Sequence, residues 1–211
     1  MRHIFCIDLP AEIREGRPLN CEFFSSNLLG MTINNHHPKP IRKKHIAALK
    51  RKGAVDVVEI AAETIEVGDW VAEKCKFGCP GYNQCLTCPP HTPTPADTRK
   101  ILAGYRRALL VHFQHSTQSG SPWPSLRRIV VAAERALFLD GFEKAWGLAG
   151  GPCELCDECT MDECRYPEMA RPAMEACGID VFTTARAANL PIEVITSRDQ
   201  TMNLYGLILV D

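Results

Sequence analysis

Residues 108–113 read Ala-Leu-Leu-Val-His-Phe, an apolar run that polar residues bound on both sides. A short run of this kind predicts a buried strand. Downstream, one apolar stripe recurs at helical spacing, formed by Leu126, Ile129, Val130, Ala133 and Leu137. This stripe predicts an amphipathic helix that begins at Ser125 and ends at Gly141. The stretch therefore predicts a buried strand followed by a long helix.

The same signals predict further elements on both sides of this stretch. Strands are expected at residues 54–60, 144–148, 192–196 and 204–210, and helices at 41–52, 70–74, 95–103, 172–176 and 181–188, with Asp69, Thr94 and Asp180 as caps. Alternating helices and strands favour an α/β sheet covered by helices. The last two strands are joined by about seven residues, too few for a parallel crossover. The predicted fold is therefore α/β, a mixed sheet covered by helices, with two cysteine-rich metal-binding loops.

Composition and charge bound the possible classes of protein. The 211 residues are 45% apolar, and the formal net charge is -1. This charge does not argue for nucleic acid or a membrane surface as a partner. No apolar run approaches the roughly 18 residues of a membrane span, and residues 1–10 lack the features of a signal peptide. We therefore expect a cytoplasmic protein with neither a membrane nor a nucleic acid as partner.

The chain divides into two predicted parts. Residues 1–53 form an N-terminal extension, without a sustained hydrophobic period before residue 41 and with a basic helix after it. Residues 54–211 form the cysteine-rich metal-binding α/β domain. The basic run at 42–45, together with residues 50–52, could contact RNA or another anionic partner. No aromatic residues are interleaved with it, so a solvated helix face is the preferred interpretation.

Eight of the eleven cysteines fall into two tight clusters. The first cluster contains Cys75, Cys79, Cys85 and Cys88, and the second contains Cys153, Cys156, Cys159 and Cys164. In the cytosol such clusters bind metal more often than they form disulfides. Two groups of four thiolates predict two metal centres with these eight ligands.

The spacing of the second cluster points to iron and sulfide. Its pattern, C-x2-C-x2-C-x4-C, differs by one residue from the bacterial ferredoxin run. The extra residue leaves open whether Cys164 closes the same centre or reaches the other one. The first cluster, C-x3-C-x5-C-x2-C, matches no single motif, although its last two cysteines fit zinc or an iron–sulfur cluster. We therefore predict two [4Fe-4S] clusters, with zinc as the alternative.

Cys177, His91 and Arg171 lie near the clusters, and each has two possible roles. Cys177 could touch a cluster, but a free cysteine is more often a buried small hydrophobe. His91 could serve the first centre or be a loop histidine that faces solvent. Arg171 could donate to a cluster sulfur or pack against a helix. Cys6 and Cys21 are not predicted to be ligands.

The charged residues beside the two clusters differ in sign. Five acidic residues interleave the second cluster, namely Glu154, Asp157, Glu158, Asp162 and Glu163. Lys74 and Lys76 flank the start of the first. Reduction adds negative charge, so the second centre should be harder to reduce. The alternative is that these carboxylates point into water, where screening removes most of the effect.

Residues from about 55 to the end resemble a family of predicted cysteine-rich metal-binding proteins, common in anaerobic bacteria and archaea. The resemblance rests on four blocks, which are the first cluster with its Cys-Pro-Pro, Ala-Leu-Leu-Val at 108–111, Ala-Gly-Gly-Pro-Cys-Glu-Leu-Cys at 149–156, and the segment 164–182. It implies metal binding through these cysteines and assigns no reaction. Seven of the eight clustered cysteines lie in these blocks, and Cys159 lies between two of them.

These observations predict an iron–sulfur protein that transfers electrons in anaerobic metabolism, with a redox protein as its partner. One alternative is a redox enzyme in which a cluster has an open iron site for substrate. Another is a zinc-binding scaffold without redox chemistry. The sequence shows no glycine-rich dinucleotide loop, P-loop or nucleophile elbow. It therefore names neither a substrate nor the redox partner.

Overall fold

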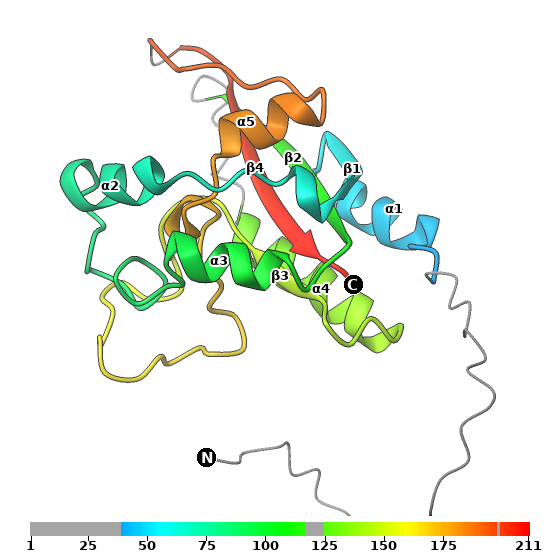
Figure 1. The fold of residues 1–211 in the computed structure, drawn as a ribbon, viewed down its shortest axis with the longest axis horizontal. Helices are drawn as coiled ribbons and strands as arrows, with labels where there is room; N and C mark the ends of the chain where they lie inside the picture. Colours follow the sequence, from blue (N-terminus) through cyan, green and yellow to red (C-terminus); the bar gives the residue numbers. More distant parts are fainter. Residues whose placement is uncertain (1–38, 117–124, 198) are drawn as a thin grey trace, which may run out of the picture. The chain divides into compact units, whose positions relative to one another are not determined.

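The computed structural model describes residues 39–116, 125–197 and 199–211, and Pro40–Asp211 form one compact unit (Figure 1). The helices are α1 (Lys43–Arg51), α2 (Asp69–Gly78), α3 (Pro95–Leu102), α4 (Leu126–Leu139) and α5 (Val181–Ala187), with short 3-10 helices η1 (Ala62–Thr64) and η3 (Glu175–Cys177). The strands are β1 (Asp56–Ala61), β2 (Arg107–His115), β3 (Trp146–Leu148) and β4 (Met202–Leu209). None of the described helices has the length and apolar character needed to cross a bilayer.

The four strands form one sheet in the order β1-β2-β4-β3. Every neighbouring pair is antiparallel, and Leu110 of β2 lies opposite Val58 of β1 and Leu207 of β4. The predicted α/β class with covering helices is confirmed, but the mixed sheet is wrong. Alternation of helices and strands suggested parallel pairs. However, the long connection from β1 to β2, which carries η1, α2 and α3, brings the chain back in the opposite direction.

The strand predicted at residues 192–196 is also wrong, because this segment has no regular structure. Both edges of β4 are already paired, with β2 on one side and β3 on the other. The segment therefore cannot add to β4 as the short connection suggested. Ile192 is buried in the core, whereas Val194 is 65% exposed and Ile195 is 40% exposed. Ile192 therefore anchors this segment in the core, and the segment does not form a strand.

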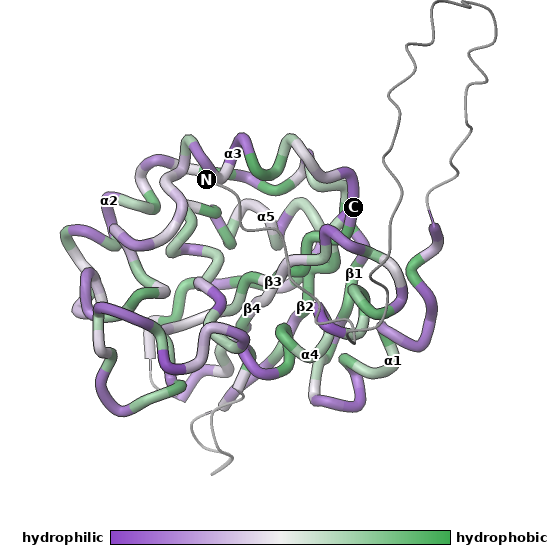
Figure 2. The backbone as a smooth tube through the Cα atoms, turned by 90° about the horizontal axis from the view of Figure 1, so that it is seen from below, coloured by the Kyte–Doolittle hydropathy of each residue, from purple (hydrophilic) through white to green (hydrophobic). Residues whose placement is uncertain are grey.

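The two faces of the sheet build two apolar cores. On one face, alternate residues of β2 and β4 pack under α5, η3 and the end of α3, among them Ala108, Leu110, Leu207, Leu209, Met174 and Ala185. On the other face, the intervening residues pack under α1 and α4, among them Leu109, Val111, Ile208, Leu49, Val130 and Leu137. Figure 2 shows α3 and α4 on opposite sides of the strands, with hydrophobic and hydrophilic residues alternating along both helices. Burial on both faces explains the continuous apolar run in β2.

Helix α1 is fixed by the basic run that the sequence singled out. Lys44 Nζ lies 2.5 Å from Asp140 Oδ2 at the end of α4, and the buried His45 Nε2 lies 2.8 Å from the same oxygen. The hydrogen bond from Lys44 holds the pKa of Asp140 below its ordinary value. Leu49 joins the core under α4. Part of the basic run therefore docks α1 on the unit that contains the sheet.

Two of the three predicted helix caps are confirmed. Thr94 Oγ1 accepts a hydrogen bond from the Asp97 amide at 3.2 Å, and Asp180 Oδ1 accepts one from the Thr183 amide at 3.0 Å. Asp69 is not a cap, because Gly68 takes that position and Asp69 opens α2. The helix also continues past the predicted end at residue 74 to Gly78, since no helix breaker intervenes. This extension places Cys75 on a helix.

Arg107 and Asp211 join the start of β2 to the end of the chain. Arg107 Nε donates to Asp211 Oδ1 at 2.9 Å, and a second guanidinium nitrogen contacts Oδ2. The hydrogen bond from Arg107 lowers the pKa of Asp211. A carboxyl group with a lowered pKa in the folded state stabilises the fold above its unfolded pKa, and this stabilisation is lost as pH falls through the folded pKa.

We expect Asp211→Asn to lower the free energy of unfolding by about 1–2 kcal/mol at pH 7, the scale of a charge-assisted hydrogen bond. The deficit should shrink as pH falls below about 4, where the wild-type carboxylate also takes up its proton. Urea denaturation at several pH values measures both effects. Glu63→Gln, at an exposed carboxylate of η1, is the control. A deficit that did not change with pH would contradict the ionic origin of the effect.

Candidate metal centres

The first cysteine cluster begins on α2 and continues through a series of tight turns. Cys75 lies in the helix, and the Cys79 amide donates to the Cys75 carbonyl at 3.3 Å. The Cys88 amide donates to the Cys85 carbonyl at 2.9 Å. A Cβ atom built on Gly81 would lie 3.6 Å from Cys79 Sγ and 4.0 Å from Cys88 Sγ. The sulfur atoms of Cys79 and Cys88 therefore both lie beside Gly81.

Three of these four cysteines border one cavity of about 400 Å³. They are Cys75, Cys79 and Cys88. The opposite wall comes from the far end of the sequence and includes Pro152, Ala173 and Glu175. Cys85 is not among the lining residues. The cavity therefore groups three cysteines of the first cluster and excludes the fourth.

Cys85 lies instead among the cysteines of the second cluster. Burial raises the pKa of the Cys85 thiol, and the nearby thiols of Cys153, Cys159 and Cys156 raise it further. The backbone of Leu86 lowers the pKa of Cys159, and the Cys85 side chain acts in the same direction. The loops of the two clusters therefore meet at Cys85, Leu86 and Cys159.

Cys88 lies between the two groups of thiols. Burial raises its pKa to about 11, and the thiols of Cys85, Cys79 and Cys75 contribute in the same direction. Cys88 thus borders the cavity of the first group while remaining close to Cys85. The two groups of cysteines are neighbours in space, although some 65 residues separate the clusters in the sequence.

The donor chemistry of both groups fits a thiolate-bound metal group. Within the described ranges, no three His, Cys, Asp or Glu side chains converge closely enough to hold a single metal ion. An iron–sulfur cluster has a different requirement, because each thiolate binds a different iron. Cysteines arranged around a cavity meet this requirement without converging on one point. The residues present therefore fit a polynuclear cluster.

Arg127 is a buried cation that the sequence analysis did not identify as part of the site. It lies on α4 and is 1% exposed. Its guanidinium donates to the carbonyl oxygens of Pro152 and Arg171, both at 2.9 Å, and forms an ion pair with Glu154. Its charge opposes the rise in pKa of Cys85 and Cys88. Arg127 therefore holds the start of the second cysteine loop close to both groups of thiols.

A signal for Arg127 was present in the helix pattern. Arg127 precedes Val131 by four residues and Glu134 by seven, which places all three on one side of α4. Val131 is buried, and Glu134 forms an ion pair with Arg171. A charged residue at helical spacing from a buried one indicates a polar contact under the helix. The apolar stripe alone does not reveal it.

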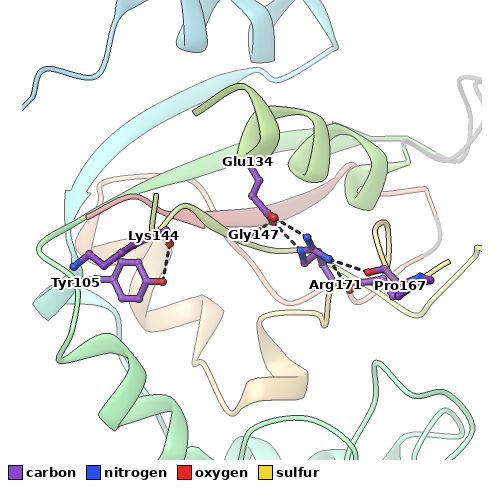
Figure 3. A network of polar contacts seen from close by, with 7 residues as sticks. Tyr105, Glu134, Lys144, Gly147, Pro167 and Arg171 are labelled. Atoms are coloured by element: carbon purple, nitrogen blue, oxygen red, sulfur yellow. Dashed lines mark hydrogen bonds and ion pairs between the residues drawn. The ribbon is translucent and has the colours of Figure 1, made fainter. Parts of the chain in front are cut away.

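Arg171 closes the second cysteine loop against α4 (Figure 3). Its Nη2 and Nε donate to Glu134 Oε1 and Oε2 at 2.6 and 2.8 Å. Glu134 Oε2 also accepts from the Gly147 amide of β3 at 2.8 Å. These contacts confirm that Arg171 packs against a helix. They also connect the loop to the sheet.

Comparison with known proteins identifies the family. The family described as "Predicted metal-binding protein (DUF2284)" matches residues 58–210. The chain belongs to this family. No curated protein and no solved structure matches the chain. The family match begins within β1, ends just beyond β4, and contains all eight clustered cysteines together with Arg127 and Arg171.

Cys177 and His91 lie outside the two cysteine groups of this member of the metal-binding family. Cys177 lies in the core at 1% exposure, and burial raises its pKa to about 12. The prediction of a buried small hydrophobe is confirmed. His91 is exposed, and its Nε2 lies 2.8 Å from Asn83 Oδ1 within the first loop. Cys6 and Cys21 lie outside the described residues.

The predicted contrast in charge between the two clusters is not supported. All five carboxylates are exposed, and one of them, Glu154, also pairs with Arg127. Lys74 and Lys76 are also exposed, and each lies 5.1 Å from the centre of an aromatic ring of α2. Solvent screens exposed charges strongly. Arg127 is a buried charge that acts on the thiols of Cys85 and Cys88.

Proposed function

We propose that this protein carries two [4Fe-4S] clusters and passes electrons to a redox partner protein in anaerobic metabolism. The meeting of the two cysteine loops at Cys85 and Cys159 carries this proposal. The eight cysteines Cys75, Cys79, Cys85, Cys88, Cys153, Cys156, Cys159 and Cys164 are the candidate ligands. Neighbouring clusters could exchange electrons with each other and with a partner.

Iron and sulfide are favoured over zinc by two observations. The second cluster has spacing close to that of ferredoxins, which suits three thiolates on three irons. The cavity beside Cys75, Cys79 and Cys88, at about 400 Å³, has room for a group larger than one ion. A tetrahedral zinc site would instead require four donors that converge on one point.

We expect anaerobically purified protein to hold about eight irons and eight sulfides per chain, the content of two cubanes. Metal analysis, sulfide analysis and electron paramagnetic resonance on the same sample measure this. Cys156→Ser should lose iron and lower stability because metal binding orders the loop. Cys6→Ser is the control and should retain both.

The alternatives give different results in the same experiment. Stoichiometric zinc without sulfide would overturn the iron–sulfur assignment in favour of a scaffold. A content of about four irons would mean that one group of cysteines holds no cluster. Full metal content in Cys156→Ser would show that this cysteine is not a ligand.

A further inference from the structure

We propose that Cys75, Cys79 and Cys88 alone hold the first cluster, so that one of its irons is open to an external ligand. Cys85 then joins the second cluster. This inference rests on the proposed function, because it concerns how the two clusters are shared among the cysteines. It adds a binding site for a ligand to the first centre.

The first step is the position of the three cysteines. Cys75, Cys79 and Cys88 share one cavity, and Cys79 and Cys88 approach each other across Gly81. Glycine at this position leaves space that a side chain would fill. The rest of the cavity lining includes Pro152, Ala173, Glu175 and Ala176, and it contains no further cysteine. A cubane placed here has three cysteine ligands.

The second step is the assignment of Cys85. Cys85 does not line the cavity that the other three cysteines of its cluster share. The thiols of Cys153, Cys159 and Cys156 act on it after burial in raising its pKa, so it is assigned to them as the fourth thiol. The ferredoxin-like run supplies three ligands and a distant cysteine supplies the fourth, which is the arrangement that C-x2-C-x2-C runs take. Cys164 then has no required place in either cluster.

The third step is access to the open iron. A second cavity of about 810 Å³ shares Cys75, Cys79 and Glu175 with the first. Its remaining walls are mainly apolar and include Val71, Ile179 and Val181, with the aromatic side chains of Trp70, Phe77 and Phe182. Trp70 is 49% exposed and Phe77 is 77% exposed. The two cavities meet at the cysteines, so the larger one leads from solvent to the first centre.

The chemistry of the walls defines the class of ligand. Aromatic and aliphatic walls favour a ligand with an apolar body. The open iron takes an oxygen donor, such as a carboxylate or a hydroxyl group. Lys74 lines the same cavity together with the carboxylates of Glu73, Glu175 and Asp180, so the charged groups of the lining do not favour an anion. The ligand class is therefore a small molecule with an apolar body and a terminal hydroxyl group.

Single cysteine variants test how the ligands are shared. Cys88→Ser should abolish the paramagnetic signal of the first cluster, and Cys85→Ser that of the second. Cys164→Ser should keep about eight irons per chain. Loss of the first signal in Cys164→Ser would overturn the proposal, because Cys164 would then complete that cluster. Loss of the first signal in Cys85→Ser while the second signal remained would overturn it equally.

Oxidation with ferricyanide gives a second readout. Ferricyanide takes one electron from a [4Fe-4S]2+ cluster with an uncoordinated iron, which leaves [3Fe-4S]+ and releases one Fe2+. We expect about seven irons per chain to remain, and the new three-iron signal to be absent from Cys88→Ser. Retention of all eight would overturn the open site. Wild-type protein without eight irons at the start would instead show failure of the proposed function.

A ligand titration tests the cavity. 3-Phenylpropanol is the probe, and the signal of the first cluster is the readout. Phe77→Asp should weaken the spectral change by about ten-fold or more in apparent Kd, near 1.4 kcal/mol. Phe138→Asp, at an exposed phenylalanine of α4, should leave it unchanged. No spectral change with this probe, or equal effects of the two variants, would overturn the cavity as the binding site.

Discussion

Replacing Arg127 with methionine should lower the free energy of unfolding by about 2–4 kcal/mol, the scale of losing several hydrogen bonds from a buried cation whose partner Glu154 is partly exposed. Methionine fills a similar volume but donates no hydrogen bonds. The carbonyl oxygens of Pro152 and Arg171 then lose their donor, and Glu154 loses its partner. Because Pro152 directly precedes Cys153, the second cysteine loop should also loosen. We therefore expect iron to be lost from the second centre as well.

Arg128→Met is the matched control for this variant. Arg128 is the next residue of α4 and is exposed, so its replacement should change stability by less than about 0.5 kcal/mol. Anaerobic urea denaturation followed by circular dichroism measures stability, and iron analysis measures cluster content. Equal stability of the two variants would show that the buried guanidinium does not support the loop.

Replacing Glu134 with glutamine should destabilise the protein by about 1–3 kcal/mol, the cost of unsatisfied polar groups. Glu134 accepts from Arg171 with both oxygens and from the Gly147 amide (Figure 3). Glutamine keeps one acceptor oxygen and places an amide donor against the guanidinium. The Arg127 side chain is fully buried, whereas Glu134 and Arg171 each retain some exposure, so the effect should be smaller than that of Arg127→Met.

Glu143→Gln is the control, because Glu143 is an exposed carboxylate close to the same strand. Chemical denaturation of both variants under the same anaerobic conditions provides the comparison. The double variant of Arg127 and Glu134 should be non-additive by about 0.5–3 kcal/mol, because both residues bind Arg171. Strict additivity would show that the two contacts act independently.

Several elements could be predicted because their signals are local. The apolar run at 108–113 lies in β2, and the stripe that follows Ser125 lies in α4. Thr94 and Asp180 cap the helices that they were predicted to cap. Each of these signals depends on residues within one or two turns of the chain. The physical cause of the element is therefore contained in the segment itself.

The predictions of a strand at 192–196 and of a mixed sheet were wrong because both features depend on distant parts of the fold. A strand exists only when a partner edge is free, and both edges of β4 are occupied. Strand direction depends on how a connection folds back over the sheet, and helices in that connection do not determine it. Neither the free partner edge nor the strand direction can be derived from the sequence of the segment that forms the strand.

The sequence by itself determined that this is a cysteine-rich protein with two candidate metal-binding loops, because ligand spacing is a property of adjacent residues. The family match agrees with metal binding. Only the tertiary structure decided which thiols are neighbours. Cys85 and Cys88 are three positions apart, yet one lies with the second group and the other borders the cavity of the first. The positions of these thiols depend on contacts between loops that are distant in the sequence. Arg127 becomes part of the site because the second loop packs over it.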